Sequence, residues 1–179
     1  MTTRRRALVL VITLYNTGLS DPGFDLPIYD YRAGAAVFYG IEAEGKFELG
    51  NYGPGRFDLE LQADYLWADN TDINEPLPRI SPVRIGGALV YTAAQWDTRL
   101  DVFRVQAQTR VAPNEFPTDG YTMINASFTY RLTPDRYGLV AFVKGTNLLN
   151  QDARNHVSYL VNIAPMGGRG VTVGVRGTF

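Results

Sequence analysis

The stretch "RFDLELQADYLW", residues 56–67, alternates strictly between apolar and polar side chains. Its apolar members are Phe57, Leu59, Leu61, Ala63, Tyr65 and Trp67, and Asp58, Glu60, Gln62 and Asp64 lie between them. Successive side chains of a β-strand point to opposite faces of a sheet. This period of two therefore predicts a strand with one apolar and one polar face.

The same period recurs along the chain. It predicts eight strands, at Leu8–Asn16, Val37–Leu49, Arg56–Ala68, Val83–Ala93, Gln95–Val111, Tyr121–Leu132, Tyr137–Leu149 and Arg169–Phe179. The fifth segment changes parity at Val102-Phe103, which predicts a β-bulge there. The longest apolar run is Ala7–Ile12, far shorter than the roughly 20 residues of a membrane-spanning helix. If this chain crosses a bilayer, it must do so as a barrel.

The connections between these strands alternate between long and short. An up-and-down sheet then has all its long connections at one end, as outer-membrane barrels have long outer loops and short periplasmic turns. From Phe57 to Trp67 the strand is roughly 33 Å long at about 3.3 Å per residue. Tilted by about 40–45°, it spans roughly 24 Å, close to the apolar band of about 25 Å in such barrels. Aromatic residues also fall near strand ends, at Tyr65, Trp67, Tyr91, Trp96, Tyr121 and Tyr137.

The predicted fold is therefore all-β: a portion of an antiparallel up-and-down transmembrane β-barrel with about eight strands. Its lumen would be lined by Glu42, Glu44, Lys46, Asp58, Glu60, Asp64, Arg84, Arg99 and Arg131. Alternation alone does not say which face is outside. A soluble, lipocalin-like binding barrel with the apolar face inward is the alternative.

Composition and motifs argue against several classes of function. The formal net charge is −1, which indicates no nucleic-acid partner. There is no Cys, so neither a disulfide nor a thiolate metal site is possible. Hydrolase, zinc-protease and phosphate-loop motifs are absent, and no catalytic residue or cofactor is predicted. Residues 1–20 fit either a first strand or a remnant signal peptide, because Arg4–Arg6 precede an apolar run.

The C-terminal part resembles a known family. "GVTVGVRGTF", residues 170–179, resembles the assembly signal of outer-membrane barrels, carried here by Val171, Val173, Val175 and Phe179. Before it, "GTNLLN" with Gly145, Asn147, Leu148, Leu149 and Asn150, a long loop and a last strand closely resemble the C-terminus of TonB-dependent outer-membrane receptors. The segments "LPIYDYRAGAAVFYGIEAEGKFEL", "LPRISPVRIGGALVY" and "PTDGYTMINASFTYRL" resemble the family in the same order. The resemblance runs from about Val11 to Phe179.

This resemblance implies that residues 1–179 form the C-terminal part of a receptor barrel, without the plug domain. The chain would be part of the wall of a transporter for a metal or a siderophore-like metal chelate, in the bacterial outer membrane. Its partners would be outer-membrane lipid, the barrel assembly machinery and the remainder of the receptor, and it would meet TonB only indirectly. A self-contained eight-strand structural barrel without active transport is the alternative, because eight strands are the smallest number that closes.

Two sets of residues are candidates for ligand contact in the predicted outer loops. His156, the only histidine, lies near Asp152 in the longest loop, and imidazole suits zinc. A single histidine does not define a coordination set, so a solvated loop residue is the simpler interpretation. Asp69, Asp72 and Glu75 could meet a cationic ligand, or they could be ordinary residues of a solvated turn.

Overall fold

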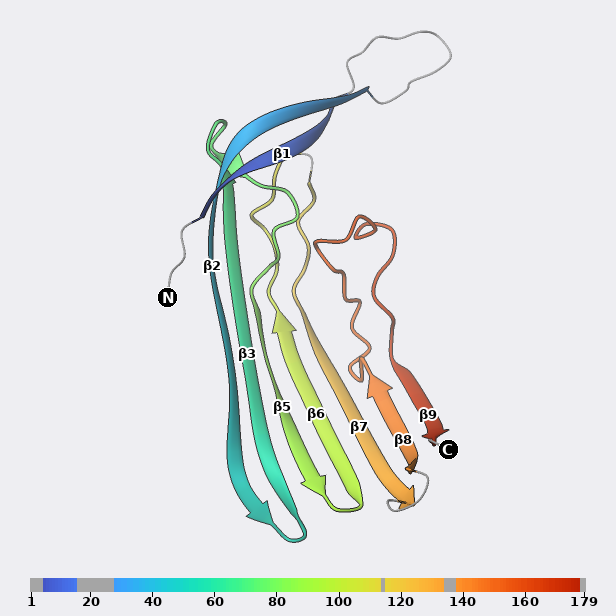
Figure 1. The fold of residues 1–179 in the computed structure, drawn as a ribbon. Coiled ribbons are helices and arrows are strands. Elements are labelled where there is room, and N and C mark those ends of the chain that lie inside the picture. Colours follow the sequence, from blue (N-terminus) through green and yellow to red (C-terminus); the bar gives the residue numbers. More distant parts are fainter. Residues whose placement is uncertain (1–4, 16–27, 114, 134–137, 178–179) are drawn as a thin grey trace, which may run out of the picture.

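The computed structural model describes residues 5–15, 28–113, 115–133 and 138–177, which form one antiparallel sheet (Figure 1). Eight long strands follow one another in the order of the sequence. They are β1 (Arg5–Tyr15), β2 (Ile28–Tyr52), β3 (Gly55–Asn70), β5 (Arg84–Ala93), β6 (Trp96–Val105), β7 (Tyr121–Thr133), β8 (Leu139–Thr146) and β9 (Gly170–Arg176). A short strand, β4 (Glu75–Pro76), pairs with the end of β3. The predicted all-β, up-and-down architecture is confirmed.

The connections separate by length between the two ends of the sheet. Gly53-Pro54 joins β2 to β3 and Ala94-Gln95 joins β5 to β6, both at the lower end in Figure 1. Three long segments lie at the other end: the β3–β5 loop (71–83), the β6–β7 loop (106–120) and the β8–β9 loop (147–169). We call this the outer end, as the predicted asymmetry requires.

The sheet is open. Strands β1 and β9 lie at its two edges and do not pair with each other in the part that the structure describes. Residues 5–15 pair with β2 along their whole length, so this part of the N-terminal segment is a strand. The remaining positions of the segment 1–20 lie outside the described residues. No helix in the described ranges is long and apolar enough to cross a membrane.

The predicted bulge at Val102-Phe103 is wrong. Strand β6 pairs in unbroken register with β5 and with β7, and it ends at Val105 rather than at the predicted Val111. The parity changes because the environment of each face changes along the strand: Phe103 and Val105 lie on the same face as Arg99, but near the outer end a loop covers that face. Two other register shifts occur, at Glu48/Gly50 and Arg131/Thr133. Gly50 adopts φ 117° at the first, a conformation that favours glycine.

The pairing register assigns each side chain to one of two faces. The apolar face includes the apolar residues of segment 56–67 and their neighbours Ile41, Phe47, Leu89, Leu100 and Phe128, which are exposed. At the short-turn end, five rings form a chain across this face, with successive centroids 6.4, 4.6, 4.6 and 5.8 Å apart: Tyr52, Phe57, Tyr91, Trp96 and Phe128. Aromatic belts of this kind mark the membrane interface of β-barrels.

Two of the aromatic residues expected at strand ends are not part of the described apolar face. Tyr121 is not part of the apolar face: it is buried on the opposite, polar face with Met123. The reason is parity, since odd positions of β7 share the face of Arg131. Tyr137 lies outside the described residues.

Candidate functional site

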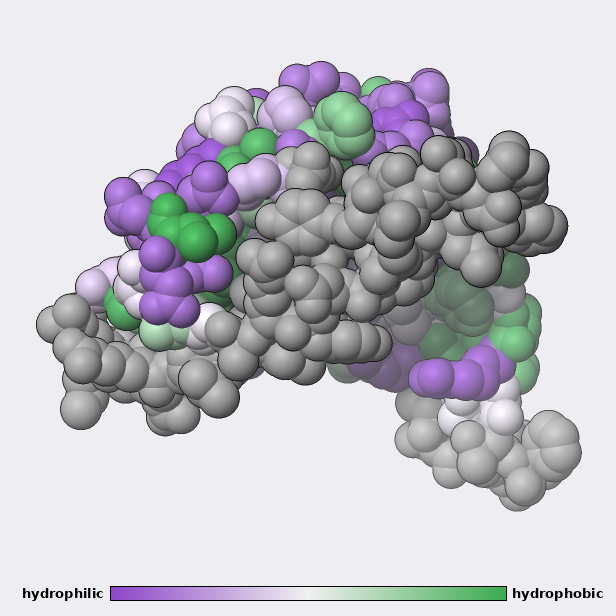
Figure 2. Space-filling model, turned by 90° about the horizontal axis from the view of Figure 1, so that it is seen from above, coloured by the Kyte–Doolittle hydropathy of each residue, from purple (hydrophilic) through white to green (hydrophobic). Residues whose placement is uncertain are grey.

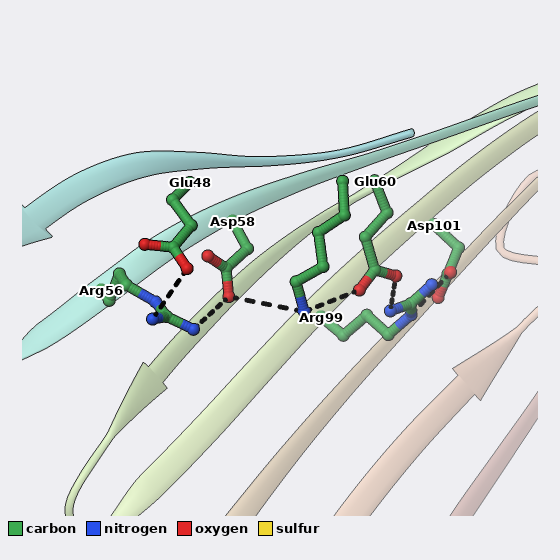
Figure 3. A network of polar contacts seen from close by, with 7 residues as sticks. Glu48, Arg56, Asp58, Glu60, Arg99 and Asp101 are labelled. Carbon is green, nitrogen blue, oxygen red and sulfur yellow. Dashed lines mark hydrogen bonds and ion pairs between the residues drawn. The ribbon is translucent and has the colours of Figure 1, made fainter. Parts of the chain in front are cut away.

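The polar face carries a network of seven charged residues that spans four strands (Figure 3). Its ion pairs connect Glu48, Arg56, Asp58, Lys46, Glu60, Arg99 and Asp101, in that order. Arg56 contacts Glu48 at 3.3 Å and Asp58 at 3.1 Å, and Lys46 lies 3.8 Å from Asp58 and 3.4 Å from Glu60. The alternation of residues 56–67, which predicted strand β3, thus also places the carboxylates of this strand on one face of the sheet.

The network crosses strand β5 at a small residue. Arg99 of β6 reaches Glu60 of β3 at 2.6 Å, although β5 lies between these strands. Ala88 of β5 is the register partner of both Glu60 and Asp101, and it is buried beneath them. Because its side chain is a single methyl group, the Arg99 guanidinium passes over it. Arg99 also donates to Asp101 at 2.8 Å.

Asp58 is the most deeply buried member of this network, with its side chain 3% exposed. Its Oδ2 accepts a hydrogen bond from Arg56, whereas its Oδ1 has no hydrogen-bond partner among the described residues. A buried carboxylate is costly unless it is paired, and the contacts with Arg56 and Lys46 offset part of this cost for Asp58.

A hollow of about 390 Å³ lies on the polar face beside this network. Its charged and polar lining consists of Glu44, Lys46, Glu60, Gln62, Arg99 and Asp101. Two further ion pairs join neighbouring strands on the same face, Asp64–Arg84 and Asp97–Arg131. All nine residues expected to line the lumen share this face by register. The arrangement provides a polar face whose charges are largely paired with one another.

At the outer end the polar face becomes apolar, and loops pack on it. Leu77 and Ile80 of the β3–β5 loop pack with Ala36 and Ala68. Ala153 of the β8–β9 loop is fully buried and packs with Val105, Tyr121 and Met123 in a second cluster. Seen from above, hydrophilic residues dominate the described part of this end, with hydrophobic side chains scattered among them (Figure 2). The loops therefore fold over the outer end of the face that carries the charges.

His156 is not the solvated loop residue that the sequence suggested. Its side chain is 1% exposed, with Nε2 3.3 Å from Glu115 Oε1 and Nδ1 3.1 Å from Thr118 Oγ1. No hydrogen bond reaches Nε2 in the described structure. Burial lowers the pKa of the His156 imidazole below its ordinary value; the Glu115 carboxylate opposes this effect, and Arg79 adds to it. His156 is therefore a buried ring between loops, and its burial favours the neutral imidazole.

The other predicted loop carboxylates have separate partners. Asp152 is exposed and lies 3.5 Å from Arg154, so the structure shows it paired there rather than with His156. Asp69 accepts a hydrogen bond from Trp67 at 2.7 Å and pairs with Arg110. Asp72 accepts from the Ala35 backbone at 2.9 Å, and Glu75 is half-buried in β4. Among the described residues, no three His, Asp or Glu side chains are grouped so as to hold a metal ion.

The motif Gly145–Asn150 has a visible structural role that sequence reasoning did not supply. Asn147 is 1% exposed, and its side chain donates to the backbone carbonyls of Gln151 and Gly167 at 2.9 and 3.0 Å and accepts from Gln151 N at 2.9 Å. Its backbone adopts φ 47°, a conformation that asparagine tolerates well. Asn150 Oδ1 accepts from Arg169 N at 3.0 Å. Together the two asparagines fasten both ends of the β8–β9 loop.

Of the remaining motif residues, Gly145 and Leu148 pack on one another. An added Cβ at Gly145 would lie 2.8 Å from Leu148 Cδ2, so the glycine leaves room for that side chain. Leu149 is exposed. Val171, Val173 and Val175 of β9 are exposed on the apolar face, and their role in an assembly signal stays a prediction. Phe179, the last residue of that signal, lies outside the described residues.

Comparison with known proteins agrees with this geometry. Residues 10–148 match the family model described as TonB dependent receptor-like, beta-barrel. Among solved structures, "Copper transporter OprC" superposes with a TM-score of 0.79 at 18% sequence identity, over 99% of this chain and 29% of that protein. The chain thus spans less than a third of the length of this structural relative. Because the family model covers most of the sequence, the chain belongs to the TonB-dependent receptor β-barrel family.

Proposed function

We propose that this chain forms the closing part of the barrel wall of a TonB-dependent outer-membrane transporter for a metal or a metal chelate. The observation that carries the proposal is the division of the sheet into an exposed apolar face and a face with a continuous charge network. A wall between lipid and a hydrated passage needs this division, whereas a soluble binding barrel needs its apolar residues inside.

The open edges support a role as part of a larger barrel. β1 and β9 each leave one side unpaired within the described sheet. Unpaired backbone groups at a sheet edge are not tolerated in lipid, so each edge needs another strand. On this proposal the remainder of the receptor supplies those strands, and the assembly machinery recognises β9 with its outward valines.

The cargo class rests on the family and on a neighbour whose name is that of a copper transporter. Transport is tested with the complete receptor gene in its source organism. Cells in which the region for residues 1–179 is deleted in frame are compared with the parent for accumulation of copper(II) chloride, zinc(II) chloride and a ferric hydroxamate chelate. Selective loss of one probe supports the proposal. Unchanged accumulation of all three contradicts a transport role.

A self-contained barrel is the second candidate, because eight long strands pair in one continuous sheet and eight are the minimum for closure. Heated and unheated samples of the chain, refolded in detergent micelles, distinguish the two candidates by gel mobility. A compact, protease-resistant band before heating indicates that β1 has found β9. A smear or aggregate indicates that the edges need the rest of the receptor.

A further inference from the structure

The three described outer loops are connected to one another in a closed cycle of contacts. His156 of the β8–β9 loop contacts Thr118 and Glu115 of the β6–β7 loop at 3.1 and 3.3 Å. Glu115 Oε1 accepts a hydrogen bond from the Arg79 backbone of the β3–β5 loop at 2.8 Å. Arg79 closes the cycle, since its Nη1 donates to the Val157 carbonyl at 3.3 Å.

A second contact strengthens the last link. The guanidinium carbon of Arg79 lies 3.2 Å from the centroid of the Tyr159 ring, a cation–π geometry. The two ends of Arg79 thus join different loops: its backbone binds Glu115 and its side chain binds the β8–β9 loop. A positive φ of 59° at Arg79 accompanies this arrangement.

These contacts lie where the loops bury little apolar surface, although hydrogen bonds such as that from Gln108 Nε2 to the Ile80 carbonyl also hold them. The loops contribute few residues to the two apolar clusters at the outer end of the sheet. Leu77 and Ile80 come from the β3–β5 loop, and Ala153 comes from the β8–β9 loop. Segments with few buried apolar contacts open at a lower free energy than strands do. In addition, the closed arrangement leaves His156 Nε2 buried without a hydrogen bond, a cost that opening removes.

We propose that these three outer loops open and close as one unit, with His156 as the latch that couples them. Breaking any one side of the cycle frees groups on the other two loops, because Glu115 and Arg79 each hold two partners. The role of this motion as a gate rests on the proposed transport function, but the coupling itself does not.

Trypsin tests the coupling directly, because each loop contains an arginine away from the strands: Arg79, Arg110 and Arg154. The β8–β9 loop has a second arginine, Arg169, next to β9, and cleavage there is counted separately. The full chain in detergent micelles is digested briefly, and cleavage after each arginine is quantified by mass spectrometry. Three variants, one per loop, are compared with the parent: Arg79→Lys, which keeps a tryptic site, Glu115→Gln and His156→Phe. An unchanged strand signal in circular dichroism shows that the sheet remains folded.

The proposal expects each variant to accelerate cleavage in all three loops, by about tenfold for the loss of one or two contacts. Asn162→Ala is the control, since Asn162 is exposed in the β8–β9 loop and takes part in none of these contacts. Acceleration confined to the loop that carries the substitution overturns the coupling, and so does unchanged cleavage in every variant. A variant that loses its sheet is set aside in favour of the other two, which test the same cycle from different loops. Cleavage does not depend on transport, so failure of this test is separate from failure of the proposed function.

Discussion

Replacing Asn147 by alanine should release the β8–β9 loop without unfolding the sheet. The substitution removes three side-chain hydrogen bonds at a site that is 1% exposed. At about 1 kcal/mol each, these contribute roughly 3 kcal/mol. The backbone at φ 47° adds about 1 kcal/mol, because alanine adopts the left-handed region less readily than asparagine. The expected loss is therefore roughly 4 kcal/mol, or about a thousandfold in the ratio of docked to released loop.

Hydrogen exchange followed by mass spectrometry measures this loss, in peptides that cover residues 147–169 of the full chain in micelles. The Gln151 amide should lose the most protection, because it donates directly to Asn147 Oδ1. Asn147→Gly should lose about 1 kcal/mol less than Asn147→Ala, since glycine accepts the positive φ. Asn162→Ala in the same loop is the matched control and should change nothing. Unchanged protection of residues 151–167 in Asn147→Ala would refute the anchoring role.

Three further predictions concern packing, the charge network and protonation. Gly87→Ala should destabilise the sheet by about 1–3 kcal/mol, since its Cβ would lie 2.7 Å from the Glu60 carbonyl oxygen. Gly145→Ala should cost less, because its Cβ would meet only the flexible end of Leu148. Chemical denaturation in micelles compares the two variants, and equal losses of stability would contradict the geometry. Ala88→Leu should separate Arg99 from Glu60, because a larger side chain would stand between them. A double-mutant cycle of Glu60→Gln and Arg99→Gln should therefore show coupling in the parent and none in the Ala88→Leu background. Persistent coupling would show that Arg99 does not cross at Ala88. The single histidine allows an unambiguous NMR titration, in which the midpoint of His156 should fall below the ordinary value of 6.5 because burial disfavours the imidazolium. With the pKa of the docked state lowered, the loops should be fully docked above about pH 6.5 and lose stability as the pH falls below that value; a midpoint above 6.5 would show that Glu115 prevails over burial.

The architecture could be predicted because membrane strands are long and their period is strict. Segment 56–67 alone determined a face for each of its residues, and the register of the sheet places them as expected. The alternation of long and short connections predicted that all the long loops lie at one end of the sheet. The prediction failed at Val102-Phe103 because a change of polarity along one face produces the same pattern as a bulge. The two cases differ only in whether a loop packs on the face, and the sequence of an irregular loop has no periodic pattern from which its packing could be predicted.

The candidate site was less predictable for the same reason. His156 and Glu115 are far apart in the sequence and come together only through two irregular loops. Proximity in sequence favoured Asp152 instead, which pairs with Arg154. A solitary histidine between Asn155 and Val157 gives no sign of burial. The asparagines of the Gly145–Asn150 motif were found by resemblance, and their hydrogen bonds now give a physical reason for the spacing.

The most direct test of the account asks which face of the sheet meets lipid. The chain has no cysteine, so Leu61→Cys and Gln62→Cys provide single labelling sites at adjacent, exposed positions on opposite faces of β3. Each variant carries an environment-sensitive fluorophore and is reconstituted into vesicles, in a complete receptor barrel if the chain alone does not close. The account predicts that a lipid-borne quencher acts on the label at position 61 and that iodide in solution acts on the label at position 62. Equal quenching of both labels by iodide, or the reverse pattern, would contradict a membrane-facing apolar wall.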